Sequence, residues 1–575
     1  MNILDTYRLW CEQATLDADV AKELQQIKGA SYEIEDRFYR ELEFGTGGLR
    51  GIIGAGTNRM NVHTVAKATQ GYSQYINAMF TEPKVAIAYD SRIKSDRFAV
   101  VAAEVFAGNG IHVWLYPQIM PTPSLSFAVR DIGCCGGIVI TASHNPAKYN
   151  GYKVYGPDGC QITTESAAEI QQKINAVDPF TDVKRIPFEA GKERGLIRMI
   201  GEATIRRYLD AVAGASVLPK NIDRGVSIVY TPLNGAGINC VPRSLTENGF
   251  TKIVIPDEQR EPDGNFPTCP FPNPEVREAL EVGLKWAAQT NSELLLATDP
   301  DCDRVGAAVR DKEDYTLING NEMGVLLLDF ICRMRVEAGT MPKRPAAVKT
   351  IVTTPMAKRV AAHYDVELID VLTGFKFIGE QIGLLESKRE ESRYIFGFEE
   401  SYGYLSGSFV RDKDAVNASL LICEMVAYYK YLGKSLLDVL NSLYQQFGYY
   451  QSRLLSFTFE GSTGFAKMSG LLASLRETKP AEIAGLAVEA VADYQLSIRT
   501  GAGGEQETIY LPKSNVLRFF LAGGSEAVVR PSGTEPKLKI YLAVTADSKE
   551  TCGRQLDDLE SDLSEIVYRK QESNQ

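Results

Sequence analysis

Long hydrophobic runs are missing from this chain of 575 residues. Its apolar stretches are short and interrupted, so none is long enough to cross a bilayer as a helix. The first 24 residues carry five acidic side chains and lack the basic start and apolar core of a secretory signal. We therefore expect no membrane association and no signal peptide, and we predict an amphipathic helix over residues 1–24.

The cysteine patterns of zinc sites and disulfide frameworks are also absent. The ten cysteines are scattered, no two are spaced C-x-x-C, and none has a histidine at a ligand spacing. This excludes a zinc site and a set of structural disulfides. Scattered unpaired thiols are typical of proteins in a reducing compartment, so we expect a cytoplasmic protein.

The chain has no excess of positive charge. Its 73 acidic side chains outnumber its 62 basic ones and leave a net charge of −11. Such a chain is not expected to hold nucleic acid by general electrostatics. A small anionic substrate is not excluded, because a few Arg and Lys side chains can dominate the field inside a cleft.

Nucleotide-binding signatures are present only in incomplete form. One glycine-rich segment has Arg50 at the third glycine position of a dinucleotide fingerprint, and a second has Cys240 at that position. The segment Gly433-Lys434-Ser435 has Tyr428 where a P-loop needs its first glycine. These departures argue against a nicotinamide site and against a P-loop phosphotransferase.

Three stretches of the chain repeat the pattern strand, helix, strand, helix, strand. The apolar runs are continuous rather than alternating, which is typical of sheets covered by helices on both faces. The repeats predict an α/β fold with three consecutive βαβαβ domains, and the third strand of each ends in a polar cluster that faces a shared cleft. The predicted strands are 85–89, 112–116 and 137–141, then 226–230, 252–255 and 293–298, and finally 347–353, 366–371 and 394–398.

The last part of the chain has a different pattern and predicts a smaller α+β domain. We expect strands at 454–459, 527–529 and 538–544, helices at 465–475 and 548–570, and a hinge at 448–452. About three to five domains are expected for this length. The predicted domains are 1–215, 216–320, 321–447 and 448–575.

Ser143 lies at the end of one of these apolar strands. Residues 138–146 read I-V-I-T-A-S-H-N-P, so the serine is presented where the chain leaves the sheet. The active centres of open α/β sheets lie at such carboxyl ends of strands. The serine is therefore a candidate nucleophile.

The segment 299–304, which reads D-P-D-C-D-R, follows another buried strand. We expect its three carboxylates to project to one side of an extended chain, where they repel one another unless a cation lies between them. An all-oxygen ligand set favours magnesium, calcium or manganese. An EF-hand is excluded, because Arg304 and Arg310 stand at the positions that need Gly and Glu.

Two further segments carry polar groups suited to binding, one of them an anion and the other sugar hydroxyls. Residues 530–537, R-P-S-G-T-E-P-K, combine an Arg, two hydroxyls and a glycine, which suits an anion cradle. Residues 399–403, E-E-S-Y-G, place a carboxylate and a hydroxyl where they can bind neighbouring sugar hydroxyls. Lys153 follows the turn that contains Ser143, and Lys413 lies at the opening of a predicted helix. Both are candidates for phosphate contact or proton transfer.

Together, and in this order, the segments at 141–146, 299–304, 399–403 and 530–536 resemble the α-D-phosphohexomutase superfamily over nearly the whole chain. The segment T-G-G-L-R-G at 46–51 is similar to the phosphoglucomutase and phosphopentomutase branch of that family. The resemblance implies four domains arranged in a heart shape around a central cleft that holds the active site.

The resemblance also implies roles for individual residues. Ser143 would carry the phosphoryl group and complete the ligand shell of one Mg²⁺ bound by Asp299, Asp301 and Asp303, and Arg304 would assist the transfer. The sugar would be gripped by Glu399 and Ser401 with Thr373 and Gly374 nearby. The distal phosphate would be held by Arg530, Ser532, Gly533 and Thr534. Phosphate contact or proton transfer is implied for Arg50, His144, Lys153 and Lys413.

The implied reaction is the reversible transfer of phosphate between the 1- and 6-positions of glucose through a phosphoserine and glucose 1,6-bisphosphate. Either Lys153 or His144 could serve as the base, and the lysine would need a depressed pKa. Alternatives are a phosphopentomutase, a phosphomannomutase, a glucose-bisphosphate synthase and a non-catalytic regulator that binds sugar phosphates. We expect a monomer or a weak homodimer.

Overall fold

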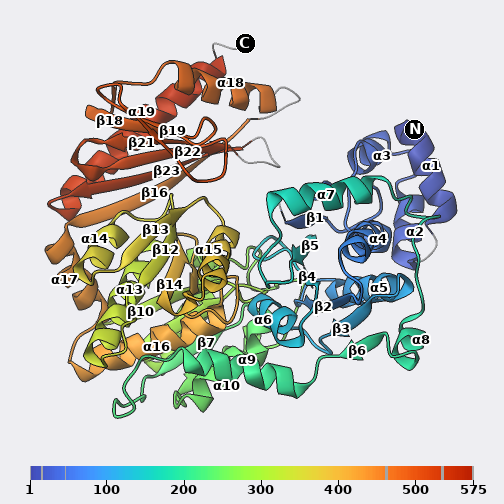
Figure 1. Cartoon of the computed structure of the whole chain (residues 1–575), viewed down its shortest axis with the longest axis horizontal. Helices are drawn as coiled ribbons and strands as arrows, with labels where there is room; N and C mark the ends of the chain where they lie inside the picture. The colour runs from blue at the N-terminus through green and yellow to red at the C-terminus, as the bar shows by residue number, and fades with distance from the viewer. Residues whose placement is uncertain (1, 15–16, 46, 460–463, 532–536, 573–575) are drawn as a thin grey trace.

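The chain folds around four separate β-sheets that pack with helices (Figure 1). The structure, a computed structural model, describes residues 2–14, 17–45, 47–459, 464–531 and 537–572. Each sheet lies inside one of the four predicted domains, which we call domains 1 to 4, and the boundaries between them stay predictions. The predicted α/β fold with mixed sheets is confirmed, and the heart-shaped outline is consistent with it.

The N-terminal segment forms three short helices rather than one. Helices α1 (Ile3–Gln13), α2 (Ala18–Gln26) and α3 (Ser31–Phe38) share a small apolar core that includes Trp10. The single helix predicted over 1–24 is therefore wrong. The Asp17 side chain caps α2 by accepting from the backbone N–H groups of Asp19 and Val20, and this begins a new helix.

Domain 1 is built on a 6-stranded sheet whose parallel centre contains the predicted strands. The serine strand β4 pairs on one side with β5, an antiparallel strand that the repeat pattern did not predict. In sheet order the strands are β1 (Gly48–Ile52), β5 (Tyr149–Tyr155), β4 (Gly136–Ile140), β2 (Lys84–Tyr89), β3 (His112–Leu115) and β6 (Ile197–Met199). The helices are α4 (Val62–Met79), α5 (Ser95–Gly108), α6 (Thr122–Ile132), α7 (Thr164–Asn175), α8 (Phe188–Glu193) and α9 (Glu202–Gly214).

Domain 2 has a 5-stranded sheet in which the three predicted strands are parallel and two antiparallel strands follow. In sheet order these are β11 (Asp314–Ile318), β10 (Val305–Asp311), β9 (Leu294–Thr298), β7 (Ile228–Thr231) and β8 (Ile253–Val254). Between β7 and β8 the chain forms a 3₁₀ turn, η1 (Ala236–Asn239), and then α10 (Val241–Glu247), whose second residue is Pro242. Helices α11 (Asp257–Arg260) and α12 (Arg277–Thr290) complete the domain.

Domain 3 has a 4-stranded sheet with the order β13 (Glu367–Val371), β12 (Ala346–Thr350), β14 (Tyr394–Glu399) and β15 (Gly403–Leu405). Strand β12 ends at Thr350 rather than at the predicted residue 353, because the chain turns there. The helices are α13 (Gly320–Glu337), α14 (Met356–His363), α15 (Phe375–Ser387), the 3₁₀ turn η2 (Glu391–Arg393), α16 (Ala415–Tyr431) and α17 (Leu436–Phe447).

Domain 4 is an antiparallel sheet with two long helices, α18 (Gly464–Glu477) and α19 (Lys549–Glu572). The predicted strands correspond to β16 (Tyr449–Thr458), β22 (Glu526–Pro531) and β23 (Lys537–Ala546). The pattern missed five strands between them, two of which are polar and carry no buried residue. These five are β17 (Glu482–Ile483), β18 (Leu486–Asp493), β19 (Ile498–Gly501), β20 (Gln506–Thr508) and β21 (Leu517–Leu521), and the turn η3 (Ala522–Gly524) follows them.

The prediction of a hinge at 448–452 is wrong for four of its five residues. Residues 449–452 belong to β16, which pairs with β23 over ten residues. Only Gly448, with φ +96°, forms a turn between α17 and the last sheet.

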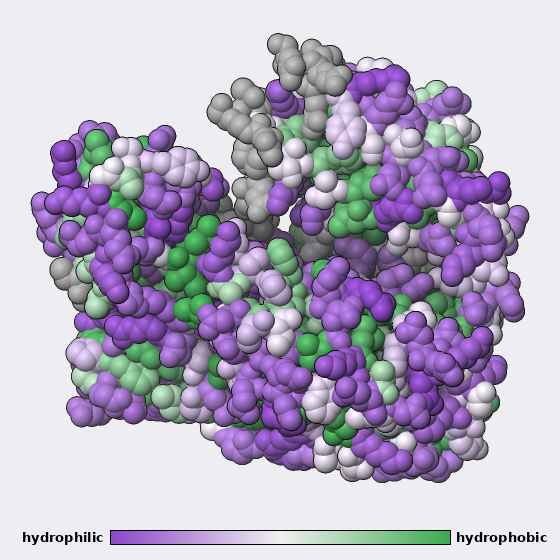
Figure 2. All heavy atoms as spheres, turned by 180° about the vertical axis from the view of Figure 1, so that it is seen from behind, coloured by the Kyte–Doolittle hydropathy of each residue, from purple (hydrophilic) through white to green (hydrophobic). Residues whose placement is uncertain are grey.

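The four domains are packed into one body with a notch on one side. A continuous apolar core runs through domains 1 to 3, and a second apolar cluster joins domain 3 to domain 4. Figure 2 shows the notch between the lobe of domain 1 and the lobe of domain 4. Among the described residues no helix is both long and apolar enough to cross a membrane.

Candidate active site and metal centre

Ser143 lies on a strained turn directly after β4. Its φ of +53° is in the left-handed region, and its side chain is almost completely buried. The hydroxyl donates to Asp299 Oδ2 at 3.0 Å and lies 3.1 Å from Nδ1 of His144. The structure therefore brings the predicted nucleophile from domain 1 against the predicted metal loop of domain 2.

The three carboxylates of the metal loop converge, although not in the way expected. Residues 299–304 form a tight turn between β9 and β10, in which the Cys302 N–H donates to the Asp299 carbonyl oxygen at 2.9 Å. The extended chain predicted for this segment is wrong. Oxygen atoms of Asp299, Asp301 and Asp303 nevertheless lie within 4.8 Å of one another, and all three residues are buried.

This turn has the properties of a divalent cation site. Oδ1 of Asp301 and Oδ1 of Asp303 are buried and have no hydrogen-bond partner among the described residues. Burial, together with the charges of the two neighbouring carboxylates, raises the pKa of Asp299 well above its usual range. A hard cation would satisfy the unpaired oxygens and relieve the repulsion, so the donor set fits Mg²⁺ or a similar ion.

Two partly buried lysines, each with 13% of its side chain exposed, neutralise part of this negative charge. Nζ of Lys153, on β5, lies 2.7 Å from Asp301 Oδ2 and 3.2 Å from Asp303 Oδ2, and Nζ of Lys413 lies 3.3 Å from Asp303 Oδ2. Burial opposes ionisation, but the carboxylates hold the pKa of both lysines above its ordinary value. The depressed pKa that a lysine base would need is therefore not found at Lys153.

The pKa of His144 is shifted in the opposite direction, downward. Burial, with the nearby Arg304 and Arg50, lowers the pKa of its imidazole well below the usual range. The lowered pKa leaves the ring neutral at physiological pH, with one unprotonated nitrogen, and also makes it a weaker proton acceptor than a free imidazole. Arg50, on β1, donates from Nη1 to Asn145 Oδ1 at 3.3 Å and so faces the serine loop.

The predicted sugar-binding residues of domain 3 lie beside the metal loop. Glu399 ends β14 and is buried, and Ser401 follows it two residues along the same turn. Burial raises the pKa of Glu399, while Lys413 and Arg304 act in the opposite sense. Thr373 and Gly374 form the turn before α15, and the next residue, Phe375, lies under Lys413 with Nζ 5.7 Å from the ring centroid.

Arg304 is held by a residue that the sequence did not single out. Its Nη1 pairs with a carboxylate oxygen of Glu275, which precedes α12, and its Nε lies 3.8 Å from Asp303 Oδ1. The carboxylates of these two partners outweigh burial and raise the pKa of the guanidinium. Arg304 is therefore a fixed cation beside the metal loop.

The predicted distal phosphate site is described only in part. Ser532, Gly533 and Thr534 lie outside the described residues. Arg530 lies on β22 opposite Lys539 of β23. Burial and this neighbouring guanidinium lower the pKa of Lys539, while Glu275 and Glu400 act in the opposite sense. The basic pair of domain 4 thus faces acidic side chains of domains 2 and 3.

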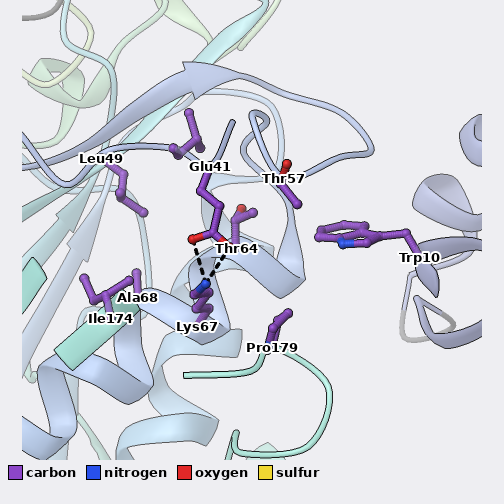
Figure 3. Close-up of a pocket in the computed structure, with 10 residues that line it drawn as sticks. Trp10, Glu41, Leu49, Thr57, Thr64, Lys67, Ala68, Ile174 and Pro179 are labelled. Atoms are coloured by element: carbon purple, nitrogen blue, oxygen red, sulfur yellow. Dashed lines mark hydrogen bonds and ion pairs between the residues drawn. The ribbon is translucent and has the colours of Figure 1, made fainter. Parts of the chain in front are cut away.

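A separate pocket lies under the N-terminal helices (Figure 3). It is lined by Trp10, Leu49 and a Lys67–Glu41 ion pair whose Nζ–oxygen distances are 2.8 and 2.7 Å. Its volume of about 30 Å³ accommodates water but no sugar phosphate. None of the site residues predicted from the sequence lines it.

Sequence models of the phosphoglucomutase/phosphomannomutase family match four consecutive parts of the chain. The models of α/β/α domains I, II and III match residues 41–180, 206–312 and 319–447, and the model of the C-terminal domain matches residues 473–559. The chain belongs to the phosphoglucomutase/phosphomannomutase family. It is accordingly a mutase, an enzyme of the isomerase class.

Relatives within this family are similar over almost their full length. The phosphoglucomutase of Staphylococcus aureus (strain bovine RF122 / ET3-1) is 37% identical over 540 residues, which are 93% of this chain and 95% of that protein. The phosphoglucomutase of Staphylococcus epidermidis (strain ATCC 35984) is 35% identical over 546 residues, which are 94% of this chain and 98% of that protein.

Solved structures of the family have the same fold. A phosphoglucomutase/phosphomannomutase family protein from Burkholderia thailandensis has a TM-score of 0.66 at 18% identity and covers 92% of this chain and 97% of its own. The open form of pp63/parafusin from Paramecium has a TM-score of 0.65 at 17% identity, with coverages of 92% and 96%.

Sequence reasoning missed the residues that shape the serine loop of this mutase. Asp90 and Arg92 follow β2, the strand beside the serine strand, and both are buried. Arg92 donates to the carbonyl oxygens of Ser143, of two further loop residues and of the first residue of β5. Asp90 accepts from Thr141, whose hydroxyl oxygen accepts from the Ser143 N–H. Polar residues directly after a buried parallel strand were the signal that could have identified them.

We expect Arg92→Met to destabilise domain 1 by about 3 kcal/mol or more, because Asp90 would remain buried without its cation. Denaturation monitored by tryptophan fluorescence measures the change, since two of the three tryptophans, Trp10 and Trp114, lie in domain 1. Arg97→Met, an exposed position on α5, is the matched control and should stay within about 0.5 kcal/mol of the wild type. A decrease of less than about 1 kcal/mol in the free energy of unfolding of Arg92→Met would contradict the role of Arg92 in holding the serine loop.

Proposed function

We propose that this mutase is a phosphoglucomutase, which interconverts glucose 1-phosphate and glucose 6-phosphate through a phosphoserine at Ser143 and glucose 1,6-bisphosphate. The observation that carries the proposal is the 3.0 Å contact between the Ser143 hydroxyl and Asp299 of the buried acidic turn. The names of relatives that are 35–37% identical over most of the chain support glucose as the sugar.

In the first half of the reaction, the 6-hydroxyl of glucose 1-phosphate attacks the phosphorus of phosphoserine. The new O6–P bond forms, the Oγ–P bond of Ser143 breaks, and the hydroxyl proton passes to a base. After the bisphosphate reorients, Oγ takes the phosphoryl group from O1, which regains a proton. Glucose 6-phosphate leaves and the phosphoserine is restored.

Phosphoryl transfer depends mainly on alignment and neutralisation of charge. A phosphoserine carries about −1.5 to −2 charge near neutral pH. We assign Arg304, Lys153 and Lys413 to offset that charge. A Mg²⁺ ion bound by Asp299, Asp301 and Asp303, and by an oxygen of phosphorylated Ser143, would add positive charge at the same point.

The base is the group that takes the proton of the attacking hydroxyl. His144 is neutral and lies beside Oγ, whereas Lys153 retains its own proton between two carboxylates. This contrast favours His144 as the base and Lys153 as a fixed cation.

The remaining predicted residues grip the substrate in this proposal. Glu399 and Ser401 bind sugar hydroxyls beside Thr373 and Gly374, and Arg50 contacts phosphate at the serine loop. The distal phosphate is held by Arg530, Ser532, Gly533 and Thr534. The proposal includes one Mg²⁺ per chain, glucose 1,6-bisphosphate as the activator, a cytoplasmic location, and a monomer or weak homodimer.

A substrate panel tests this function. We expect kcat/KM for glucose 1-phosphate to exceed the values for mannose 1-phosphate and ribose 1-phosphate by about tenfold or more. Each assay contains Mg²⁺ and glucose 1,6-bisphosphate, titrated separately. A higher kcat/KM for the pentose would make the protein a phosphopentomutase, and no turnover with any of the three would contradict the mutase function.

A further inference from the structure

Thr122, the first residue of α6 in domain 1, reaches across to the acidic turn of domain 2. The residue is fully buried, and its hydroxyl donates to Asp301 Oδ2 at 2.7 Å. Its backbone N–H donates to the carbonyl oxygen of the same aspartate at 2.8 Å. One residue of domain 1 thus holds both the main chain and the side chain of a predicted metal ligand, although the proposed function gives it no role.

The two oxygens of the Asp301 carboxylate have different surroundings. Oδ2 accepts from the Thr122 hydroxyl and lies 2.7 Å from Lys153 Nζ. Oδ1 is buried and has no hydrogen-bond partner among the described residues. Hydrogen bonds from outer partners orient the carboxylates that bind metals. With Oδ2 held by two donors, the carboxylate is fixed in rotation and Oδ1 stays available as a ligand.

The other two carboxylates of the acidic turn are held in the same way. Oδ1 of Asp299 accepts from two backbone N–H groups of the turn, at 3.1 and 3.0 Å. Oδ2 of Asp303 pairs with Lys153 and Lys413, and its Oδ1 has no hydrogen-bond partner in the described part of the chain. The protein therefore fixes each carboxylate through one of its oxygens, which prepares the turn for a cation.

The chain around Thr122 is itself fixed in position. Pro121 and Pro123 flank the residue, and their rings restrict the backbone at the start of α6. The carbonyl oxygen of Pro121 accepts from both the N–H and the hydroxyl of Ser124, at 2.9 and 2.6 Å. The Thr122 hydroxyl is therefore presented to Asp301 by a rigid support.

We propose that Thr122 is a positioning residue that orients Asp301 toward the divalent cation and thereby sets the affinity of the enzyme for that cation. The inference rests on the proposed function, because it assumes the metal site at Asp299, Asp301 and Asp303. In this role Thr122 acts through the Asp301 carboxylate and contacts neither the cation nor the substrate. Since Thr122 and Ser143 belong to the same domain, the contact also ties the metal loop to the domain that carries the nucleophile.

The test measures cation binding to full-length Thr122→Val, which keeps the branched shape of threonine and loses the hydrogen-bond donor. The dissociation constants for Mg²⁺, by calorimetry, and for Mn²⁺, by electron paramagnetic resonance, should rise about tenfold or more. At saturating Mg²⁺, kcat should stay within about threefold of the wild type, because the ligands themselves are unchanged. Intact mass verifies that all samples have the same phosphorylation state.

Two further variants separate the role of the hydroxyl from its effect on folding. Thr122→Ser keeps the hydroxyl and should bind both ions within about threefold of the wild type. Thr69→Val is the matched control, since Thr69 is also fully buried in domain 1, and its hydroxyl donates to the Val65 carbonyl oxygen at 2.8 Å and to the Tyr152 hydroxyl at 3.1 Å. This control should lower the melting temperature without changing either dissociation constant.

A purely structural role for Thr122 would lower the melting temperature of Thr122→Val and leave its dissociation constants within about threefold of the wild type, which would overturn the proposal. Equal losses of affinity in Thr122→Ser or in Thr69→Val would also overturn it. Thr122→Ala, which removes the hydroxyl and the methyl group, decides the question if Thr122→Val does not fold. Failure of the proposed metal site would instead appear in the wild-type enzyme, as lack of binding of either ion.

Discussion

Ser143→Ala is expected to reduce the interconversion of glucose 1-phosphate and glucose 6-phosphate at least about 10⁴-fold in kcat, because it removes the atom that carries the phosphoryl group. The surrounding turn should keep its shape. Its backbone is held by Arg92 and Thr141, and alanine keeps the β-carbon of serine. A coupled assay with glucose 1,6-bisphosphate and Mg²⁺ present measures the loss.

The matched control is Ser244→Ala in α10 of domain 2. Ser244 is equally buried, and its hydroxyl has no hydrogen-bond partner among the described residues, so its removal should leave the activity unchanged. Retention of a tenth or more of the wild-type kcat by Ser143→Ala would contradict the role of the serine.

Asp301→Asn is expected to lower kcat/KM at least about 100-fold at a fixed Mg²⁺ concentration, and to shift the Mg²⁺ dependence to higher concentration. Loss of an outer-shell partner of a metal ligand costs about 10- to 100-fold, and loss of a charged ligand should cost no less. The substitution also removes the carboxylate that lies 2.7 Å from Lys153 Nζ. Initial rates across a Mg²⁺ titration measure both effects.

Asp311→Asn provides the control for this variant. It changes the same residue type in the β10–β11 hairpin of the same domain, at an exposed position outside the acidic turn. We expect wild-type rates and a wild-type Mg²⁺ dependence. A Mg²⁺ titration of Asp301→Asn that overlays the wild-type curve would show that the acidic turn holds no catalytic cation.

Much of the fold could be predicted because continuous apolar strands mark the parallel centre of domains 1 to 3. The strands that end before Ser143, before Asp299 and at Glu399 all lie within a residue or two of their predicted positions. Antiparallel strands such as β5 and the polar strands β19 and β20 were missed, since their pairing depends on distant partners rather than on local apolar runs.

The candidate site was predicted from polar residues at the ends of strands, but its internal contacts were not. The sequence identified Arg304 and Lys153 without their partners, because Glu275 and Asp301 reach them from other parts of the chain. The pKa of Lys153 illustrates the consequence. Burial alone would lower it, and only the positions of two carboxylates reveal that it is raised.

The central claim is that Ser143 accepts and donates the phosphoryl group beside the acidic turn. Peptide mass spectrometry tests it most directly after the wild-type enzyme is incubated with glucose 1,6-bisphosphate and Mg²⁺. We predict one added phosphoryl group on the peptide that contains Ser143. When that group is isotopically labelled, excess unlabelled glucose 1-phosphate should replace the label with unlabelled phosphate, because each turnover gives the serine phosphoryl group to O6 and takes the one on O1. Turnover with no phosphate on that peptide, or with a label that excess substrate does not replace, would contradict the account.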